Sequence, residues 1–321
     1  MIPRAVVCPD SFKGTLTAAA VSTALALGLR RAGLDADELP AADGGEGTLA
    51  ALGGERRIAT VSDPLGRAVE AEWRLRADGT AVVEAAQASG LTLVHGGERN
   101  AWAASSRGTG ELIVAAACAG ARGVIVAAGG TATTDGGAGA VEALRDASVE
   151  VELTVLCDVR TAWEDAARVF APQKGADPTT VARLETRLDE LASQAPQDPR
   201  GVPLTGAGGG LSGGLWAFAA ARLVPGAPFV LDALGLDERL AAASLCITGE
   251  GRLDEQTLAG KVVSEVAARC ARVGVPCHAV AGEAALAADA LGLASVREAG
   301  TLEQIAAVAA SLGRSVLRRG A

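Results

Sequence analysis

Short apolar runs alternate along this chain with longer segments in which apolar residues recur at helical spacing. Such alternation is typical of α/β proteins, in which helices cover both faces of a mostly parallel sheet. It predicts strands at Ala5–Cys8, Ala36–Leu39, Thr80–Ala85, Gly123–Ala128, Val151–Cys157, Leu245–Thr248, Cys277–Ala281 and Ala294–Arg297. It predicts helices at Thr15–Arg31, Gly110–Ala119, Thr179–Ala192, Leu215–Arg222, Thr257–Arg272 and Leu302–Leu317. The expected fold class is therefore α/β.

Length and charge limit the classes of protein to which this chain could belong. The chain has 321 residues, more than one small core requires, so we expect two domains. Its net charge of −9 argues against nucleic-acid binding, which would show as clustered Lys and Arg. No charged-then-apolar leader opens the chain, and no uncharged apolar run is long enough to cross a membrane. We therefore expect a cytoplasmic protein with no membrane partner.

The cysteines and histidines give little sign of a metal site. The six cysteines show no C-x-x-C spacing and mostly lie in apolar runs, as buried and reduced thiols would. The two histidines, His95 and His278, lie far apart in the sequence. A His/Cys zinc site is therefore not expected.

Acidic, glycine-rich clusters lie directly after the predicted strands. They are Asp10 after the first strand, Asp43-Gly44-Gly45-Glu46-Gly47 after the second, Gly129-Gly130, Asp158 and Gly249-Glu250-Gly251. In a parallel sheet the carboxyl ends of the strands lie at one edge, so we expect these loops to converge on one cleft. That cleft is the predicted active site.

The segment from Gly129 to Gly139 has the composition of a phosphate-binding loop. Glycines let backbone N–H groups approach an oxyanion, the Thr hydroxyls add donors, and a following helix would add its positive end. It is not a Walker A loop, because the chain contains no G-x-x-x-x-G-K-[ST]. The alternative is a tight turn that needs glycine only for its backbone conformation.

Lysine is rare and unusually placed. Lys and Arg together number 29, yet the chain has only three lysines, and each lies next to a glycine: Lys13-Gly14, Lys174-Gly175 and Gly260-Lys261. A compact ammonium group on a loop suits a contact to phosphate or carboxylate. The alternative is chance placement on solvated turns.

Acidic groups precede the third of these lysines. In the segment from Gly249 to Thr257, Glu250 and Asp254 could supply oxygen ligands to a Mg2+–nucleotide complex. Part of the pattern is also explained by ordinary capping of the helix that follows, since acidic residues favour that end.

The segment Gly208-Gly209-Gly210-Leu211-Ser212-Gly213 fits G-x-G-x-x-G, and with Gly214 it also fits G-x-S-x-G. Both motifs need a strand leading in. Pro199 and Pro203 precede this segment and make a central strand improbable. A nucleotide-binding oxidoreductase, or a serine nucleophile with His278, is therefore the weaker interpretation.

Taken together, these loops resemble the bacterial glycerate kinase family, whose members phosphorylate glycerate with ATP. The matching pieces occur in the family's order: Cys8 to Gly14, Ala42 to Thr48, Gly108 to Glu111, Gly129 to Gly139, Cys157 to Val159, Pro172 to Ala176, and Thr248 to Asp254 with Gly260-Lys261. They cover the chain from Ala5 to about Gly282. Each piece alone is weak, but the ordered set is specific.

The resemblance implies two α/β domains. One would be Rossmann-like and formed from both chain ends, residues 1–62 with 278–321, and the other would be inserted at 63–277, with the active-site cleft between them. It further implies ATP and Mg2+ as cofactors, D-glycerate as acceptor and 2-phosphoglycerate as the usual product. Whether such a protein is a monomer or a homodimer stays open.

The resemblance and the loop chemistry together suggest roles for individual residues. Asp10, Ser11, Lys13 and Lys174 are expected to contact the substrate, with Lys13 also acting in catalysis. Nucleotide binding is expected from Gly129, Gly130, Thr131, Gly136, Gly137 and Lys261. Among Asp43, Asp135, Asp158, Glu250 and Asp254, one carboxylate should act as base and one or two should hold Mg2+, with Glu250 and Asp254 as the metal candidates.

Two features depart from the family pattern. The chain is short between Arg145 and Val151 and compact in its C-terminal part. After Asp158-Val159 the family continues with an Asn-Pro-Leu turn, whereas this chain has Arg160-Thr161-Ala162. A non-catalytic regulator of kinase ancestry is therefore a further alternative.

Overall fold

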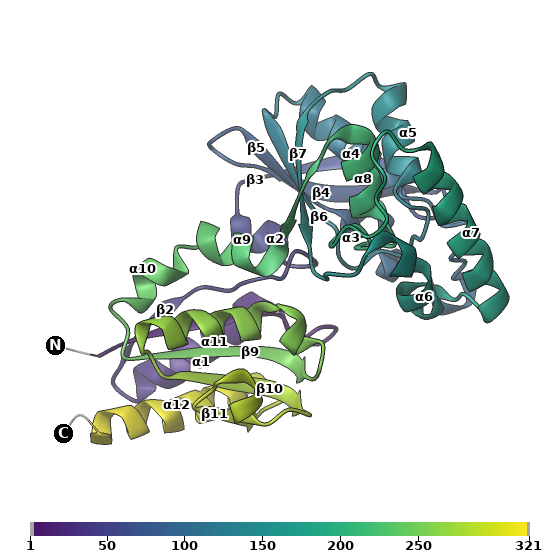
Figure 1. Cartoon of the computed structure of the whole chain (residues 1–321). Helices are drawn as coiled ribbons and strands as arrows, with labels where there is room; N and C mark the ends of the chain where they lie inside the picture. Colours follow the sequence, from purple (N-terminus) through teal and green to yellow (C-terminus); the bar gives the residue numbers. More distant parts are fainter. Residues whose placement is uncertain (1–2, 320–321) are drawn as a thin grey trace. The chain divides into compact units, whose positions relative to one another are not determined.

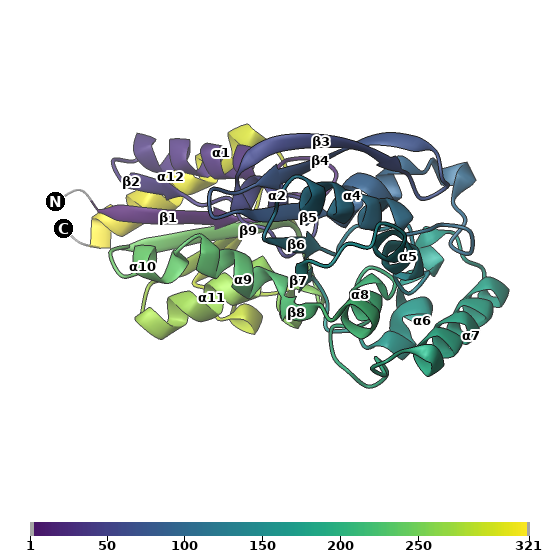
Figure 2. The ribbon, with the colours of Figure 1, turned by 90° about the horizontal axis from the view of Figure 1, so that it is seen from above.

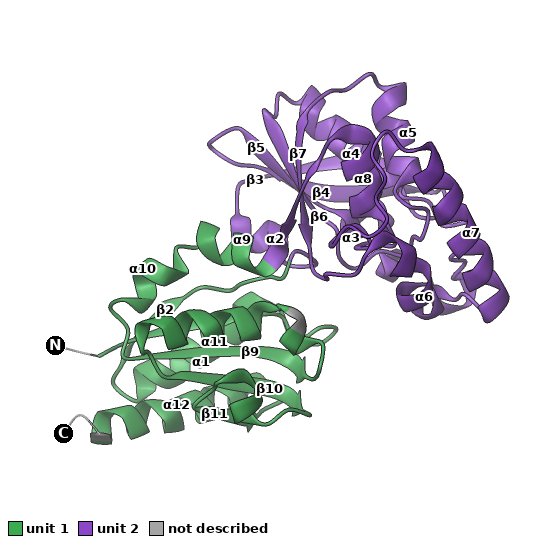
Figure 3. Ribbon diagram, viewed as in Figure 1, with its two compact units in different colours: residues 1–43, 227–321 green, residues 44–226 purple. Residues whose placement is uncertain are grey.

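The computed structural model describes residues 3–319 and divides into two compact units (Figure 3). Unit 1 comprises Met1–Asp43 and Ala227–Ala321, and unit 2 comprises Gly44–Gly226. The expected α/β class, with one unit formed from both chain ends and the other inserted, is confirmed.

The boundaries lie elsewhere than expected because of strand pairing. β9, Leu245–Leu253, fell in the expected inserted domain, yet it pairs with β1, Arg4–Pro9, in the register Val6↔Cys246 and therefore belongs to unit 1. β3, Glu55–Ser62, fell in the expected Rossmann-like domain, yet it pairs with β4, Ala68–Leu75, in unit 2. Backbone hydrogen bonds between strands thus set both boundaries.

Unit 1 contains a five-stranded parallel sheet of order β11-β10-β9-β1-β2. The other strands are β2, Asp35–Glu38, β10, Cys277–Ala284, and β11, Ser295–Glu298. Successive side chains of a strand point to opposite faces. Ala5 and Val7 accordingly pack in one apolar cluster, and Val6 and Cys8 pack in another.

Helices cover both faces of this sheet, as Figures 1 and 2 show within unit 1. α1, Ala18–Arg31, and α12, Leu302–Arg319, lie on the face of Val7. The opposite face is covered by α9, Gly226–Ala233, α10, Leu236–Leu240, and α11, Val262–Val273. The arrangement is that of a doubly wound sheet.

α1 and α12 pack closely because α1 has a glycine at the contact. A Cβ added to Gly28 would lie 2.1 Å from the carbonyl oxygen of Ala306. We therefore expect Gly28→Ala to force the helices apart and lower the free energy of unfolding by about 1–3 kcal/mol. Thermal unfolding would measure this, with Gly97→Ala as the control, since an added Cβ there meets nothing within 4 Å. Equal effects of the two substitutions would contradict this account.

Unit 2 contains a six-stranded sheet in sequence order from β3 to β8. β4 runs antiparallel to both of its neighbours, β3 and β5, Thr80–Glu84, whereas β5 runs parallel to β6, Gly123–Ala127. β7, Glu152–Cys157, and β8, Arg222–Pro225, continue the parallel part. The sequence did not predict β3, β4 or β8, because these strands are short of apolar runs and β3 and β4 carry many charges.

Helices α4, Arg107–Cys118, α5, Ala138–Asp146, and α8, Leu211–Ala219, pack with the sheet in one apolar core. The remaining helices of unit 2 are short or peripheral: α2, Thr48–Leu52, α3, Ala85–Ser89, α6, Ala166–Phe170, and α7, Pro178–Gln194. α6 and α7 form a separate small cluster around the buried Trp163. No helix within residues 3–319 has the length and apolar character needed to span a bilayer.

Two expected helices have different bounds in the structure. The helix expected at Leu215–Arg222 begins earlier and ends at Ala219, because Ala220 adopts φ 54° and the chain then enters β8. The helix expected at Thr257–Arg272 is interrupted at Gly260, with φ 99°, so that a 3-10 turn, Thr257–Ala259, precedes α11. Left-handed residues cannot continue a right-handed helix.

Candidate active site

In unit 1, charged side chains gather where β1 and β9 end. Asp10 directly follows β1, and its backbone N–H donates to Gly249 of β9 at 2.8 Å. Asp43 follows β2, and its carboxylate lies 3.3 Å from the ammonium of Lys13. Asp10 and Asp43 are each only 2% exposed, whereas the Lys13 side chain is 56% exposed. The structure thus brings together three residues that the sequence assigned to substrate binding and catalysis.

Burial raises the pKa of Asp10 to about 7, and the negative charge of Asp43 acts in the same direction while Lys13 opposes it. The negative charge of Glu250 also raises it. Burial likewise raises the pKa of Glu250, against a hydrogen bond from Thr257 and the positive charges of Lys261 and Lys13. Three carboxylates and two lysines therefore act on one another in this group, and perturbed carboxylates of this kind are typical of functional sites.

Glu250 and Asp254 are linked through one hydroxyl group. The Thr257 hydroxyl donates to Glu250 at 2.6 Å and accepts from the Asp254 backbone N–H at 3.1 Å. Asp254 also accepts from the Gln256 N–H and lies 3.4 Å from Arg252. Glu250 lies within β9 rather than in a loop after it, because that strand continues to Leu253. Glu250 is thus held inside the acidic group, while Asp254 serves the turn before α11.

Ser11 lies beside this group, and its backbone N–H donates to the carboxylate of Asp10 at 2.6 Å. Lys261 is the residue before α11 and acts electrostatically on Glu250. The unit 1 group therefore comprises Asp10, Ser11, Lys13, Asp43, Glu250 and Lys261.

Asp10 gives this group a measurable pH signature. A carboxyl group whose pKa is raised on folding binds more protons in the folded state, so its contribution to stability is lost as pH rises from about 4 to about 7. Asp10→Asn removes this pH-dependent contribution to folding stability, and the Asn amide oxygen can still accept from the Ser11 N–H. We expect the variant to unfold at a higher temperature than the native protein at pH 8, with the difference vanishing near pH 4. A pH-independent difference would contradict the assigned cause.

In unit 2, the segment from Gly129 to Gly139 follows β6 and meets a buried lysine. The Lys174 side chain is 3% exposed, and its ammonium lies 3.3 Å from the Thr131 hydroxyl and 2.5 Å from the Thr133 carbonyl oxygen. Burial lowers the pKa of Lys174 to about 8, while the charges of Asp135 and Asp158 oppose the shift. A buried amine at this loop is suited to an anionic group.

The Thr134 hydroxyl is buried, and Thr134 directly follows Thr133, whose carbonyl oxygen accepts from Lys174. The Thr134 hydroxyl has no hydrogen-bond partner among the described residues, and the residue is 0% exposed. Buried hydroxyls are normally paired, so an orphan of this kind calls for an explanation. A bound oxyanion would supply the missing acceptor.

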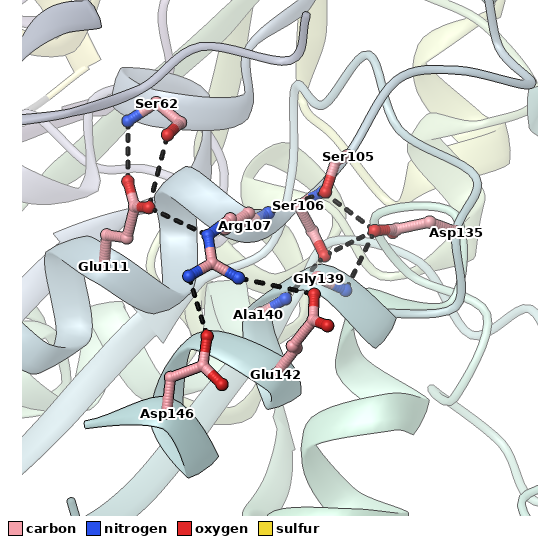
Figure 4. Close-up of polar contacts among 10 residues, drawn as sticks. All are labelled: Ser62, Ser105, Ser106, Arg107, Glu111, Asp135, Gly139, Ala140, Glu142 and Asp146. Carbon is pink, nitrogen blue, oxygen red and sulfur yellow. Dashed lines mark hydrogen bonds and ion pairs between the residues drawn. The ribbon is translucent and has the colours of Figure 1, made fainter. Parts of the chain in front are cut away.

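Asp135 is held by four hydrogen bonds from its own unit, three of which Figure 4 shows. Its carboxylate accepts from the backbone N–H and the hydroxyl of Ser106, both at 2.8 Å, and from the N–H group of Gly139 at 3.2 Å. It also accepts from the Gly137 N–H at 3.2 Å, a bond that Figure 4 does not draw. The N–H groups at the start of α5 therefore bind Asp135. These bonds fix Asp135 against Ser106 and the start of α5, and its catalytic role stays a prediction.

The glycines of this loop divide into two groups. A Cβ on Gly136 would lie 2.7 Å from Trp163, and one on Gly137 would lie 2.9 Å from the Leu211 carbonyl oxygen, so both permit close packing. A Cβ on Gly129 would lie 2.8 Å from Gly45 and 3.0 Å from the Asp158 carboxylate. Gly129 therefore lets the Gly44–Gly47 turn and Asp158 approach the end of β6. Nucleotide contacts by Gly129, Gly130, Thr131, Gly136 and Gly137 stay a prediction.

The Gly208 to Gly213 segment lacks the context that either of its motifs needs. Turns precede it where a strand would be required, and α8 begins at Leu211. The Ser212 hydroxyl is buried and donates to the Leu204 carbonyl oxygen at 2.6 Å. A Cβ on Gly209 would lie 2.0 Å from the Thr133 carbonyl oxygen, so the glycines here serve close packing.

Comparison with known proteins shows the family to which the chain belongs. The model of the glycerate kinase family matches residues 5–149 and 143–315. The chain belongs to the glycerate kinase family. It is an enzyme of this family, as the resemblance predicted. The two matched segments meet at residues 143–149, where the chain was expected to be short.

Individual relatives agree with the family assignment. The chain is 39% identical to glycerate kinase of Halalkalibacterium halodurans, over 86% of this chain and 84% of that protein. It is 38% identical to glycerate 2-kinase of Escherichia coli strain K12, over 87% and 85%. A crystal structure assigned as glycerate kinase 2 from Salmonella typhimurium LT2 superposes with a TM-score of 0.83 at 34% identity, covering 100% of this chain and 99% of that one.

The structure places residues around the Gly129 to Gly139 loop that the sequence did not single out. Ser106 holds Asp135, and Arg107 beside it binds Glu111, Glu142 and Asp146 (Figure 4). Glu111 in turn accepts from the N–H and hydroxyl of Ser62 at the end of β3. Of these additional residues only Glu111 was named from the sequence, within the Gly108 to Glu111 piece of the family resemblance.

Glu84 is a second addition. It ends β5, is 4% exposed, and accepts from the Leu49 N–H at the start of α2 at 2.8 Å. Burial raises the pKa of Glu84, although hydrogen bonds from Leu49, Gln87 and Gly47 oppose the shift. Glu84 therefore fixes the Gly44–Gly47 turn. An isolated Glu at the end of an apolar run gives no sign of this role in the sequence.

Proposed function

We propose that the chain transfers the γ-phosphoryl group of ATP to D-glycerate and that the product is 2-phosphoglycerate. The observation that carries the proposal is the unit 1 group, in which buried Asp10, Asp43 and Glu250 act on one another beside Lys13 and Lys261. Phosphoryl transfer requires carboxylates and ammonium groups of this kind to place Mg2+, phosphates and an acceptor hydroxyl. Family membership supports glycerate as the acceptor.

The carboxylates of unit 1 fit Mg2+, which takes oxygen ligands. Burial and the like charge of Asp43 raise the pKa of Glu250, and a cation held there would relieve that repulsion. We assign Glu250, with Asp43, as the group that would hold the ion. When bound, Mg2+ would neutralise phosphate charge during transfer. Asp254 would help by fixing Thr257, which donates to Glu250.

The proton of the attacking hydroxyl must pass to a base as the new phosphorus–oxygen bond forms and the bond to the ADP oxygen breaks. We assign this role to Asp10, because a pKa of about 7 suits a general base near neutral pH. Lys13 would neutralise the glycerate carboxylate or the transferring group. Asp43 lies 3.3 Å from the Lys13 ammonium and would position it.

In unit 2 we assign the Gly129 to Gly139 loop and Lys174 to an anionic group of a substrate. The orphaned Thr134 hydroxyl and the buried Lys174 ammonium support this assignment. Asp158, whose carboxylate lies beside Gly129, would position the same loop. We place the enzyme in the cytoplasm, where its proposed donor ATP is found, and none of the six cysteines forms a disulfide.

A coupled assay tests the proposal. ADP release from MgATP should depend on D-glycerate, and enolase added alone should consume the product, because 3-phosphoglycerate would first need a mutase. No ADP release by folded protein, together with no ATP binding by calorimetry, would refute a kinase. ATP binding without turnover on several hydroxy acids would instead indicate a regulator, and NADH binding detected by fluorescence would indicate an oxidoreductase.

The assignment of Lys174 to an anionic group of a substrate can be tested through its pH dependence. The pKa of Lys174 falls from 10.5 to about 8 on folding, so the unfolded state binds more protons between these values and stability should rise with pH across this window. Anion binding should weaken over the same window, because the ammonium is lost. Calorimetry above pH 8 should detect proton uptake on ATP binding, and Lys174→Met should abolish it. Unchanged uptake in that variant would remove Lys174 from the site.

A further inference from the structure

Three cysteines from separate parts of the sequence converge in unit 1. Cys246 on β9 and Cys277 on β10 are register partners in neighbouring parallel strands, so their side chains share one face of the sheet. Cys270 lies on α11, which packs on that face. Each sulfur lies within 4.8 Å of the other two. The residues are 0%, 0% and 3% exposed for Cys246, Cys270 and Cys277.

The separation of the sulfurs matches the size of a metal site. An ion about 2.3 Å from each of three sulfurs in a plane would hold them about 4.0 Å apart. The sulfurs lie within 4.8 Å of one another, so a contraction of at most about 0.8 Å would close the site. A set of thiolates selects soft, thiophilic ions over Mg2+ or Ca2+. This group is thus chemically separate from the carboxylates at the strand ends.

The charge of the ion is constrained by burial. Three thiolates carry three negative charges, and a divalent ion leaves one, whereas a monovalent ion would leave two in an apolar core. Divalent ions that favour sulfur therefore fit best.

We propose that Cys246, Cys270 and Cys277 form a binding site for a divalent thiophilic ion of the class of Zn2+ and Cd2+. Binding breaks three S–H bonds, forms three metal–sulfur bonds and releases three protons to solvent. The ion would tie α11 to β9 and β10. Because Cys246 and Glu250 lie on the same strand, the ion would also stabilise the part of unit 1 that carries the acidic group.

Titration of the reduced protein with Cd2+ tests this proposal. We expect sulfur-to-cadmium charge-transfer absorption that saturates at one ion per chain, a higher midpoint of thermal unfolding, and competition by Zn2+. Cys270→Ala and Cys277→Ala should each weaken Cd2+ binding at least tenfold. Cys118→Ser, which changes an exposed thiol, should bind Cd2+ as the native protein does.

Two outcomes would overturn the proposal. The first is the absence of sulfur–cadmium absorption from the native protein at saturating Cd2+, a result that does not depend on whether any variant folds. The second is unchanged absorption in Cys270→Ala that is lost in Cys118→Ser. In either case the three thiols would be ordinary packing in an apolar core.

Discussion

Replacing Lys13 by Ala should reduce kcat at least a hundredfold, which is typical of losing one charged contact to a transition state. The Lys13 ammonium lies 3.3 Å from the buried Asp43 carboxylate, and its charge also acts on Asp10 and Glu250. Its side chain is half exposed, so its removal should change the folding stability little. Steady-state kinetics with D-glycerate and MgATP would measure the effect.

The pattern of the loss identifies the role of Lys13. A fall in kcat places its charge on the transferring group, whereas a rise in the KM for glycerate alone places it on the acceptor carboxylate. Arg4→Ala is the matched control, because Arg4 lies on β1 in the same unit and forms a comparably exposed ion pair with Asp37 at 2.7 Å. Near-normal kinetics in Lys13→Ala would remove Lys13 from the chemistry.

Asp135→Asn should lower the free energy of unfolding by about 3 kcal/mol or more, the scale of breaking a buried charged network. The Asp135 carboxylate accepts four hydrogen bonds and is 6% exposed. The side-chain NH2 group of Asn would face the donors of Ser106, Gly137 or Gly139. At least one of these buried donors would then lose its acceptor. Denaturant unfolding would measure the change.

A neighbouring acid supplies the control for Asp135. Asp146 binds Arg107 at 2.8 Å in the adjoining network, but its side chain is 57% exposed, so Asp146→Asn should change stability by less than about 1 kcal/mol. If Asp135→Asn folds as stably as Asp146→Asn but loses activity, Asp135 acts directly in the chemistry instead of orienting the loop.

Most of the site's components could be predicted from the sequence, because their signals are local. Placing Asp10 and Asp43 after apolar runs required only the rule that parallel strands end at one edge. The scarcity of lysine marked Lys13 and Lys174. What could not be predicted is where each hydrogen bond goes. The glycine-rich loop had the composition of a phosphate cradle, yet the N–H groups at its helix end bind Asp135.

The sequence by itself determined the α/β class, the family and the strand-end position of the acidic loops, because hydrophobic periodicity and ordered motifs are properties of neighbouring residues. Only the tertiary structure decided the unit boundaries, the hydrogen-bond partners of Asp135 and the meeting of Cys246, Cys270 and Cys277. These depend on the pairing and register of strands far apart in the chain and on the helix packed over them. No spacing of residues along the sequence records such contacts.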